Sequence, residues 1–191
     1  MFSIEGYRKE EYGNAARTGS KVFRGKGSGA GGGRKLTVEE AVMEYGDMLF
    51  RISMVLLGHE QDAQDVVQDT FCRYMEHRQA WYDKDHEKAW LIRVAVNRCK
   101  DVHRGRRRHP MVCLEEVEQY CEFPEQSEVL TALMNLPGQM KTVLYLHYIE
   151  GYKSAEIARM LGITTSAVKK RMQRGRERMK LSLSGEETLS S

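Results

Sequence analysis

The chain has 191 residues, of which 41% are hydrophobic and 30% charged, a composition typical of a soluble helical protein with one or two small domains. Its longest apolar run, Met54 to Leu57, is far too short to cross a membrane, and no hydrophobic stretch follows the basic residues at the N-terminus. Four cysteines without a CxxC pair favour a reducing compartment. We therefore expect a cytoplasmic protein that neither inserts into membranes nor is secreted.

The net charge of +3 conceals blocks of opposite sign along the chain. Residues 39–69 carry eight acids and one base, whereas residues 88–108 carry eight bases and one acid. Residues 109–136 carry six acids and no base, and residues 137–191 carry ten bases and five acids. Such alternation indicates that different segments bind partners of different charge.

The N-terminal part of the chain predicts a tail followed by two helices. Residues 1–36 contain the run GKGSGAGGG and are expected to be a disordered basic tail, because they offer little apolar area to offset the entropy of ordering. Thr37 and Glu40 form a capping box that begins a helix, and Gly58 ends it. A second helix is predicted from Glu60 to about Ala80, with Met75 facing inward. Its outward face is polar and mostly acidic: Asp62, Asp65, Gln68 and Asp69.

A polar loop, Trp81 to Glu87, precedes a third predicted helix from Lys88 to about Arg104. Basic side chains near tryptophan and tyrosine rings are typical of proteins that bind single-stranded nucleic acid, in which bases stack on the rings. For Trp90, a place in the core is an equal alternative. The residues that suggest this binding surface are Trp81, Tyr82, Trp90, Arg93, Asn97, Lys100, Arg104, Arg106 and Arg107.

Residues 109–124 contain prolines and acids without periodicity, and they predict an acidic linker instead of a packed element. A second helical domain is expected at residues 125–182, with one helix from Glu125 to Asn135 and another that begins at Pro137 and ends at Gly151. Residues 183–191 read as a polar tail. We predict an all-α fold of two small helical domains, residues 37–108 and 125–182.

The segment from Gly151 to Lys180 has the pattern of a helix-turn-helix. Gly162 suits a turn that needs a positive φ, and Thr164 or Thr165 can cap the second helix. The spacing of four, three and four residues places Val168, Met172, Gly175 and Met179 on one inward face. The opposite face can donate to phosphates and base edges in the major groove, through Ser166, Lys169, Lys170, Gln173 and Arg174.

Asp62 to Trp81, followed by Lys88 to His109, resembles region 2 of the bacterial sigma factors, and Leu136 to Lys180 resembles their region 4. No region 3 domain lies between them, which is similar to the extracytoplasmic-function (ECF) group of the sigma-70 family. Lys153 departs from the family, which often has a Ser or Thr cap at this position, and we expect Ser154 to take over that role. Lys169 and Lys170 also depart from the usual single base, so the promoter sequence read here is expected to differ.

The resemblance implies a sigma factor that directs RNA polymerase core enzyme to promoters, with no catalytic residue, cofactor or metal of its own. The face around Asp62, Asp65, Gln68 and Asp69 would dock on the β′ clamp, while the C-terminal domain would contact the β flap. The third helix would meet the melted −10 element, with a base pocket from Tyr82 to Glu87, and the helix-turn-helix would read the −35 element. An anti-sigma factor is a further expected partner.

Two other classes of protein share some of these features. A stand-alone helix-turn-helix regulator would account for the C-terminal segment but gives no role to the acidic and basic helices at residues 62–108. A thiol or metal sensor could use Cys99 and His103, which are four residues apart, but two ligands are too few for a zinc site. A hydrolase is disfavoured because no nucleophile–base pattern is present.

Overall fold

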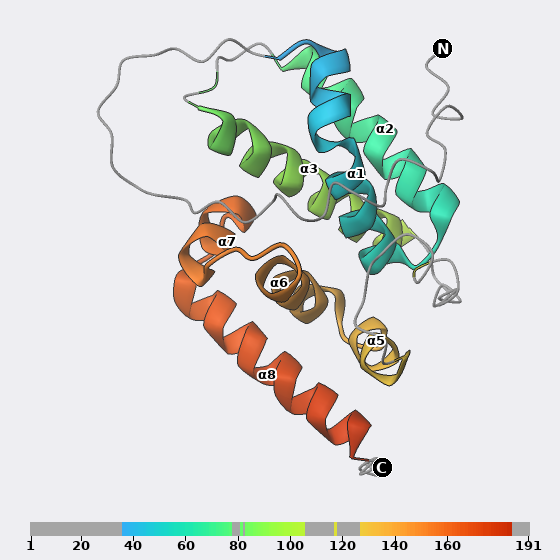
Figure 1. Ribbon diagram of the computed structural model, residues 1–191, viewed down its shortest axis with the longest axis vertical. Helices are drawn as coiled ribbons and strands as arrows, with labels where there is room; N and C mark the ends of the chain where they lie inside the picture. Colours follow the sequence, from blue (N-terminus) through green and yellow to red (C-terminus); the bar gives the residue numbers. More distant parts are fainter. Residues whose placement is uncertain (1–35, 78–80, 82, 106–116, 118–126, 185–191) are drawn as a thin grey trace. The chain divides into compact units, whose positions relative to one another are not determined.

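The computed structural model describes residues 36–77, 81, 83–105, 117 and 127–184, all within one compact unit, Gly31–Ser191. Most of the predicted tail and linker, and the residues Tyr82, Arg106 and Arg107, lie outside this part of the chain. The described residues form seven helices and no strand, which confirms the predicted all-α fold. The helices, shown in Figure 1, are α1 (Val38–Leu57), α2 (Glu60–Glu76), α3 (Lys84–Gly105), α5 (Ser127–Met134), α6 (Gly138–Tyr148), α7 (Ser154–Leu161) and α8 (Thr165–Leu183).

Helix α1 has the predicted ends. The N–H of Glu40 donates to Thr37 Oγ1 at 3.2 Å, and the N–H of Thr37 donates to Glu40 Oε2 at 2.8 Å, so the capping box is present. At the other end Gly58 has a φ of 69°, and its N–H donates to Met54 O at 2.7 Å. Both ends are therefore set by local sequence signals.

The ends of α2 and α3 differ from the prediction. Helix α2 ends at Glu76 instead of about Ala80. The N–H of His77, the next residue, donates to the carbonyls of Arg73 and Tyr74 in the last turn. Helix α3 begins at Lys84, one turn before the predicted Lys88, because the Asp83 carboxylate accepts from the N–H of His86 at 2.7 Å and caps the helix. Met75 was predicted to face inward but is 56% exposed, whereas the adjacent Tyr74 is buried.

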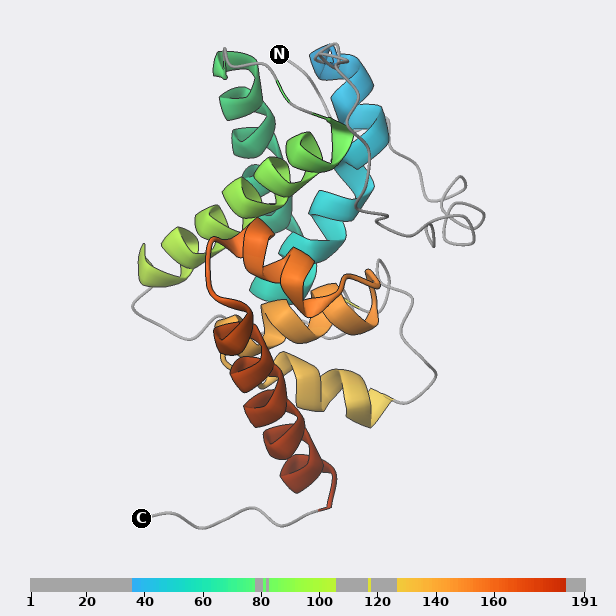
Figure 2. The same cartoon turned by 90° about the vertical axis from the view of Figure 1, so that its left-hand side faces the viewer.

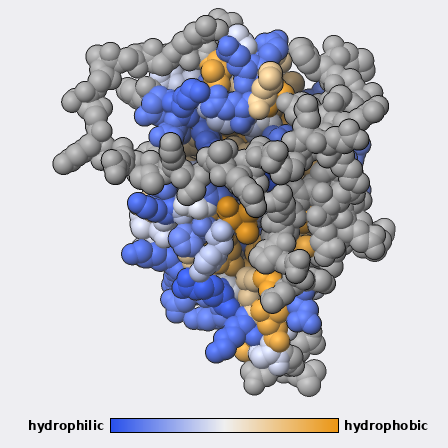
Figure 3. Space-filling view, viewed as in Figure 1, coloured by the Kyte–Doolittle hydropathy of each residue, from blue (hydrophilic) through white to orange (hydrophobic). Residues whose placement is uncertain are grey.

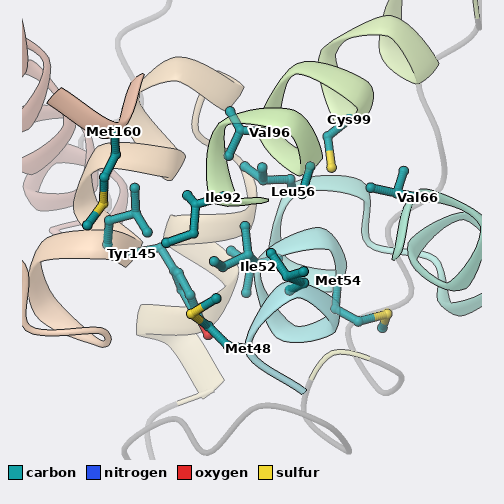
Figure 4. Close-up of a cluster of buried hydrophobic side chains, with 14 of the residues drawn as sticks. Met48, Ile52, Met54, Leu56, Val66, Ile92, Val96, Cys99, Tyr145 and Met160 are labelled. Atoms are coloured by element: carbon teal, nitrogen blue, oxygen red, sulfur yellow. The ribbon is translucent and has the colours of Figure 1, made fainter. Parts of the chain in front are cut away.

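Helices α1, α2 and α3 pack together, and α5, α6 and α7 each contact α8 or its neighbours (Figures 1 and 2). One apolar cluster runs through both groups: Figure 4 shows Ile52 of α1 and Ile92 of α3 near Tyr145 of α6 and Met160 of α7. Val117 is fully buried in this cluster. It is the one described residue of the predicted acidic linker, residues 109–124.

Candidate polymerase and promoter interface

The helix-turn-helix has the predicted geometry. Gly162, between α7 and α8, has a φ of 65°, a conformation that costs little without a Cβ. Thr164 caps α8, its Oγ1 accepting from the N–H of Ala167 at 3.1 Å. Val168, Met172 and Gly175 are buried, so the inward face is confirmed. The local sequence thus fixes which face of α8 points outward.

The start of α7 corrects one prediction. Ser154 was expected to cap this helix, but it is the first helical residue, and its hydroxyl donates to Met172 Sδ at 3.8 Å. Lys153 holds the cap position, and its N–H donates to Glu156 Oε2 at 2.8 Å. Glu156 is buried, so this bond satisfies a backbone donor by means of a side chain three residues away.

The outward face of α8 presents all five predicted side chains to solvent: Ser166, Lys169, Lys170, Gln173 and Arg174. Hydrophilic side chains follow this helix in Figure 3. Gln173 Nε2 donates to Glu177 Oε1 at 2.9 Å, and this bond holds the amide on the exposed face. One amide hydrogen and the carbonyl oxygen remain for a base edge.

A groove of about 470 Å³ lies between the start of α6 and α8. Its α6 side is formed by Pro137, Gly138, Gln139 and Met140, and its α8 side includes Lys170, Arg171 and Arg174. The first N–H groups of a helix have no partner within it and attract anions. The sequence did not predict that Arg171 and the start of α6 belong to this site. The Pro-Gly pair indicates a helix start, but only the fold shows that this start lies beside α8.

On α3, Arg93, Asn97 and Arg104 are exposed, and Lys100 is half-buried. Lys100 Nζ donates to Asn97 Oδ1 at 3.0 Å, so the two predicted residues act as a pair. Burial, followed by the positive charges of Arg171 and Arg104, lowers the pKa of Lys100 below its ordinary value. The structure thus joins four of the predicted −10 residues on one helix.

An aromatic cluster lies where α2 ends and α3 begins. The His77 ring is 4.3 Å from the Trp81 ring and 4.7 Å from the Trp90 ring, measured between centroids. Trp81 is 4% exposed and belongs to the core, whereas Trp90 is half-buried. Glu87 was predicted to line a base pocket, but it is buried within α3 and its carboxylate accepts from the Tyr74 hydroxyl. It cannot line a surface pocket.

The acidic face of α2 is smaller than predicted. Asp65 and Gln68 are exposed, but Asp62 is only 9% exposed and lies 3.7 Å from His59 Nδ1. Asp69 Oδ2 lies 3.3 Å from Arg73 Nε and 2.9 Å from Arg98 Nε. Asp62 was therefore wrongly placed on the outward face, and Asp69 also joins α2 to α3.

The residues proposed for a sensor are engaged in the fold. Cys99 is 1% exposed, and burial raises the pKa of its thiol to about 12. His103 Nε2 lies 2.9 Å from Leu56 O. Among the residues that the structure describes, no three His, Cys, Asp or Glu side chains are grouped to hold a metal ion. Within the same described residues, every helix falls short of the length and apolar character that a bilayer span requires.

Comparison with known proteins identifies both halves of the chain. Residues 41–109 match sigma-70 region 2, and residues 126–179 match sigma-70 region 4. The chain is 31% identical to the ECF RNA polymerase sigma factor SigM of Mycobacterium tuberculosis over 154 residues, 77% of each chain. It is 30% identical to SigE of Mycolicibacterium smegmatis over 175 residues, covering 85% of this chain and 66% of that protein.

Two solved structures share the fold. CnrH in complex with the cytosolic domain of CnrY is 27% identical, with a TM-score of 0.59 over 78% of this chain and 88% of that one. The sigma factor RpoE of Bartonella quintana, in complex with the anti-sigma factor NepR, is 19% identical, with a TM-score of 0.57 over 76% of this chain and 96% of that one. The second likeness concerns the fold alone.

Region 2 followed by region 4 defines a sigma factor of the sigma-70 family. The chain belongs to the ECF group of that family. Its function is therefore to direct RNA polymerase to promoters. The region 2 match covers residues 62–108, for which a stand-alone helix-turn-helix regulator has no role.

Proposed function

We propose that α2 docks this sigma factor on the β′ clamp of core polymerase, that α3 binds the melted −10 element, and that α8 reads the −35 element. The observation that carries the proposal is the division of exposed charge: Asp65 lies on the outer face of α2, whereas the outer faces of α3 and α8 are basic. Carboxylates repel DNA and attract a basic protein surface, so the faces suit different partners.

For the −35 element, α8 enters the major groove with its exposed face toward the bases. Gln173 can bond adenine and Arg174 guanine with two hydrogen bonds each, while Lys169 and Lys170 suit phosphates or a less selective contact. Ser166 lies near the start of the helix, where contacts to phosphate are common. The groove beside Arg171 and the start of α6 would hold a phosphate of the same strand.

For the −10 element, the exposed face of α3 meets the unpaired strand through Arg93, Asn97, Lys100 and Arg104. Trp90 is half-buried, so part of its ring is available to stack on a base. Extruding a base costs a few kcal/mol, which stacking and edge hydrogen bonds must offset. Tyr82, Arg106 and Arg107 remain proposed contacts to the −10 element, as the resemblance to region 2 implies.

The proposed partners follow from the same faces. Core polymerase would contact α2 through its β′ clamp and the C-terminal helices through its β flap. We propose that the protein binds both core polymerase and promoter DNA in the cytoplasm. CnrH and RpoE were solved in complexes, the latter with an anti-sigma factor. We propose an anti-sigma factor as a partner of this chain too.

Charge reversal at Asp65 tests the docking of α2. Asp65 is exposed and can be replaced without breaking the ion pairs of Asp69. Asp65→Lys should weaken binding to core polymerase by at least about tenfold, because like charges would then face each other. Glu39→Lys makes the same charge change on α1 and should bind normally. If both variants bind core polymerase with equal affinity and have native circular dichroism spectra, the proposed docking role of α2 is wrong.

A further inference from the structure

A buried hydrogen bond joins the last turn of α2 to the first turn of α3. The Tyr74 hydroxyl donates to the Glu87 carboxylate, and it lies 3.0 Å from Leu36 O, just before α1. Tyr74 is 0% exposed and Glu87 is 2% exposed. One side chain of α2 therefore contacts both the segment before α1 and the start of α3.

The Tyr74–Glu87 pair is polar at a place where apolar packing would suffice. A buried carboxylate loses its hydration, and apolar side chains of similar volume often fill such a site with equal or greater stability. A hydrogen bond, however, holds its donor and acceptor within narrow limits of distance and direction, whereas apolar side chains can repack. The pair is therefore suited to set the position of α3 relative to α2.

The Tyr74 ring belongs to a group of four rings, which we call the ring cluster: Tyr74, His77, Trp81 and Trp90. Tyr74 and Trp81 are stacked with their planes 2° apart and their centroids 6.2 Å apart. The Trp90 centroid lies 5.3 Å from that of Trp81 and 6.5 Å from that of Tyr74. These separations lie in the range of favourable ring pairs. A displacement of Tyr74 therefore reaches Trp90 both directly and through Trp81.

The ring cluster extends from the core to the surface. Tyr74 and Trp81 are buried, whereas His77 and Trp90 are half-buried. Trp90 precedes Arg93 by three residues and Asn97 by seven, and these spacings place the three side chains on one side of α3. The outer edge of the cluster thus borders the face that we propose for the unpaired −10 strand.

The position of Trp90 matters because stacking requires a close and parallel approach of ring and base. A binding group must be held within about 0.5 Å of its productive position by the packing and hydrogen bonds behind it. Behind Trp90 lie the rings of Trp81 and Tyr74, and behind these lies the hydrogen bond to Glu87.

We propose that Tyr74 and Glu87 are positioning residues for promoter opening: their buried hydrogen bond holds the ring cluster so that Trp90 can stack on an unpaired base of the −10 strand. The proposal rests on the proposed function, because it takes α3 to be the helix that binds this strand. Neither Tyr74 nor Glu87 touches DNA, since both act through the rings.

The rate of promoter opening by the holoenzyme tests this role. Tyr74→Phe keeps the ring and removes the hydrogen bond. With 2-aminopurine in the −10 element as the probe, opening should slow at least about fivefold, a factor that the stacking of one base on a ring readily supplies. Affinity for core polymerase and formation of the closed complex should stay unchanged, because α2 and α8 keep their exposed faces.

Two kinds of control separate positioning from a general loss of stability. Val66→Ala removes buried atoms from the same helix at a comparable cost in stability, and it should open promoters at the normal rate. Glu87→Gln keeps an acceptor for the Tyr74 hydroxyl and should open faster than Glu87→Leu, which has none. Adding Tyr74→Phe to Glu87→Leu should slow opening little further, because the bond is already lost.

Tryptophan emission of the free chain gives a second readout. Trp81 and Trp90 are the two tryptophans of the sequence, so the emission reports the ring cluster alone. Tyr74→Phe should shift the emission to longer wavelength as Trp90 becomes more exposed, and Val66→Ala should not. Equal opening rates for Tyr74→Phe and Val66→Ala would overturn the proposal, as would slow opening by Tyr74→Phe with an unchanged emission spectrum.

The positioning role and the proposed function can fail separately. If Asn97→Ala opens promoters slowly while Tyr74→Phe opens them as fast as Val66→Ala, the −10 role of α3 stands and the positioning role is refuted. If Asn97→Ala opens promoters normally while Tyr74→Phe is slow and has the shifted emission, the positioning role stands and the −10 contact of Asn97 is refuted.

Discussion

Gly175 of α8 lies directly against Leu144 of α6: a Cβ built at position 175 would come within 2.7 Å of Leu144 Cδ1 and 3.4 Å of Met140 Cβ. Gly175 is buried, and Leu144 is only 3% exposed. The close approach lets α8 rest on α6 with its basic face turned outward. A glycine inside a helix is ordinarily unfavourable, so its presence here is explained by packing.

Gly175→Ala should therefore destabilise the protein. Alanine gains about 1 kcal/mol of helix propensity, but overpacking at a buried site costs about 1–3 kcal/mol, so we expect a net loss of about 1 kcal/mol. Gly138→Ala is the control, because a Cβ there meets nothing within 4 Å. Urea unfolding of both variants measures the difference. A more stable Gly175→Ala protein would show that Leu144 can move aside at no cost.

The stability of the protein should depend on pH through Lys141. This side chain of α6 is 4% exposed, and burial lowers its pKa from 10.5 to about 8. Because the folded-state pKa lies below the unfolded value, the penalty is complete below pH 8 and disappears as the pH rises toward 10.5. Lys141→Met should raise the free energy of unfolding by about 1–3 kcal/mol at pH 7.

Lys141→Met should raise the free energy of unfolding much less at pH 10 than at pH 7. Lys180→Met, at an exposed position of α8, is the control and should have no pH-dependent effect. Guanidinium unfolding at both pH values gives the two differences. A gain of equal size at pH 7 and pH 10 would mean that packing, and not the buried charge, is the cause.

Tyr74 should stabilise the first three helices through its hydroxyl. That group bonds the buried carboxylate of Glu87 and lies 3.0 Å from Leu36 O. Tyr74→Phe should cost about 1–3 kcal/mol, the usual effect of leaving a buried polar group without its partner. Tyr148→Phe removes a hydroxyl from a 57% exposed side chain and should cost much less.

The cost of Tyr74→Phe should shrink in alkali. Burial, and then the hydrogen bond to Glu87, raises the pKa of Tyr74 above its ordinary value of 10.0. The contribution of the neutral phenol is complete below pH 10 and decreases as the pH rises, because the unfolded chain then ionises. Thermal unfolding at pH 7 and pH 11 compares the two proteins; a deficit that widens with pH would be the wrong sign.

Asn97→Ala should impair promoter opening more than closed-complex formation. Asn97 is exposed on α3 and is paired with Lys100, so it can present its amide to an unpaired base. We expect about a tenfold loss on duplex promoters, since edge bonds to a base are worth roughly 1–3 kcal/mol. A pre-melted template should rescue this variant but not Arg174→Ala, because Arg174 is placed on the duplex −35 element. If Asn97→Ala stays defective on the melted template, its role precedes or lies outside opening.

Local signals in the sequence predicted the helix ends that depend on neighbours in the chain. The Thr37–Glu40 capping box, the Thr164 cap and the positive φ of Gly58 and Gly162 are all present. The start of α3 was misplaced although its signal was also local: Asp83 stands three residues before His86, whose N–H it accepts. The apolar pattern of this helix begins several residues after the cap, so the pattern alone placed the helix start too late.

Features that depend on contacts distant in the chain were not predicted. Asp62 lies on the polar side of α2 by periodicity, yet packing leaves it 9% exposed. Arg93 bonds carbonyls 66 and 67 residues away, and no spacing in the sequence shows which helix end it meets. Arg171 differs little from its basic neighbours in the sequence, and only the position of α6 places it in a groove.

Run-off transcription with core polymerase on a promoter library randomised in the −35 element tests the central claim most directly. The unsubstituted chain should direct core polymerase to a subset of promoters, and alone it should show no specific binding to duplex DNA. Gln173→Ala and Arg174→Ala should each relax the preference at one or two −35 positions, because a bidentate pair with a base discriminates by about 1–3 kcal/mol. Transcripts identical to those of core polymerase alone, or specific duplex binding without core polymerase, would contradict the assignment of this chain as a promoter-directing subunit.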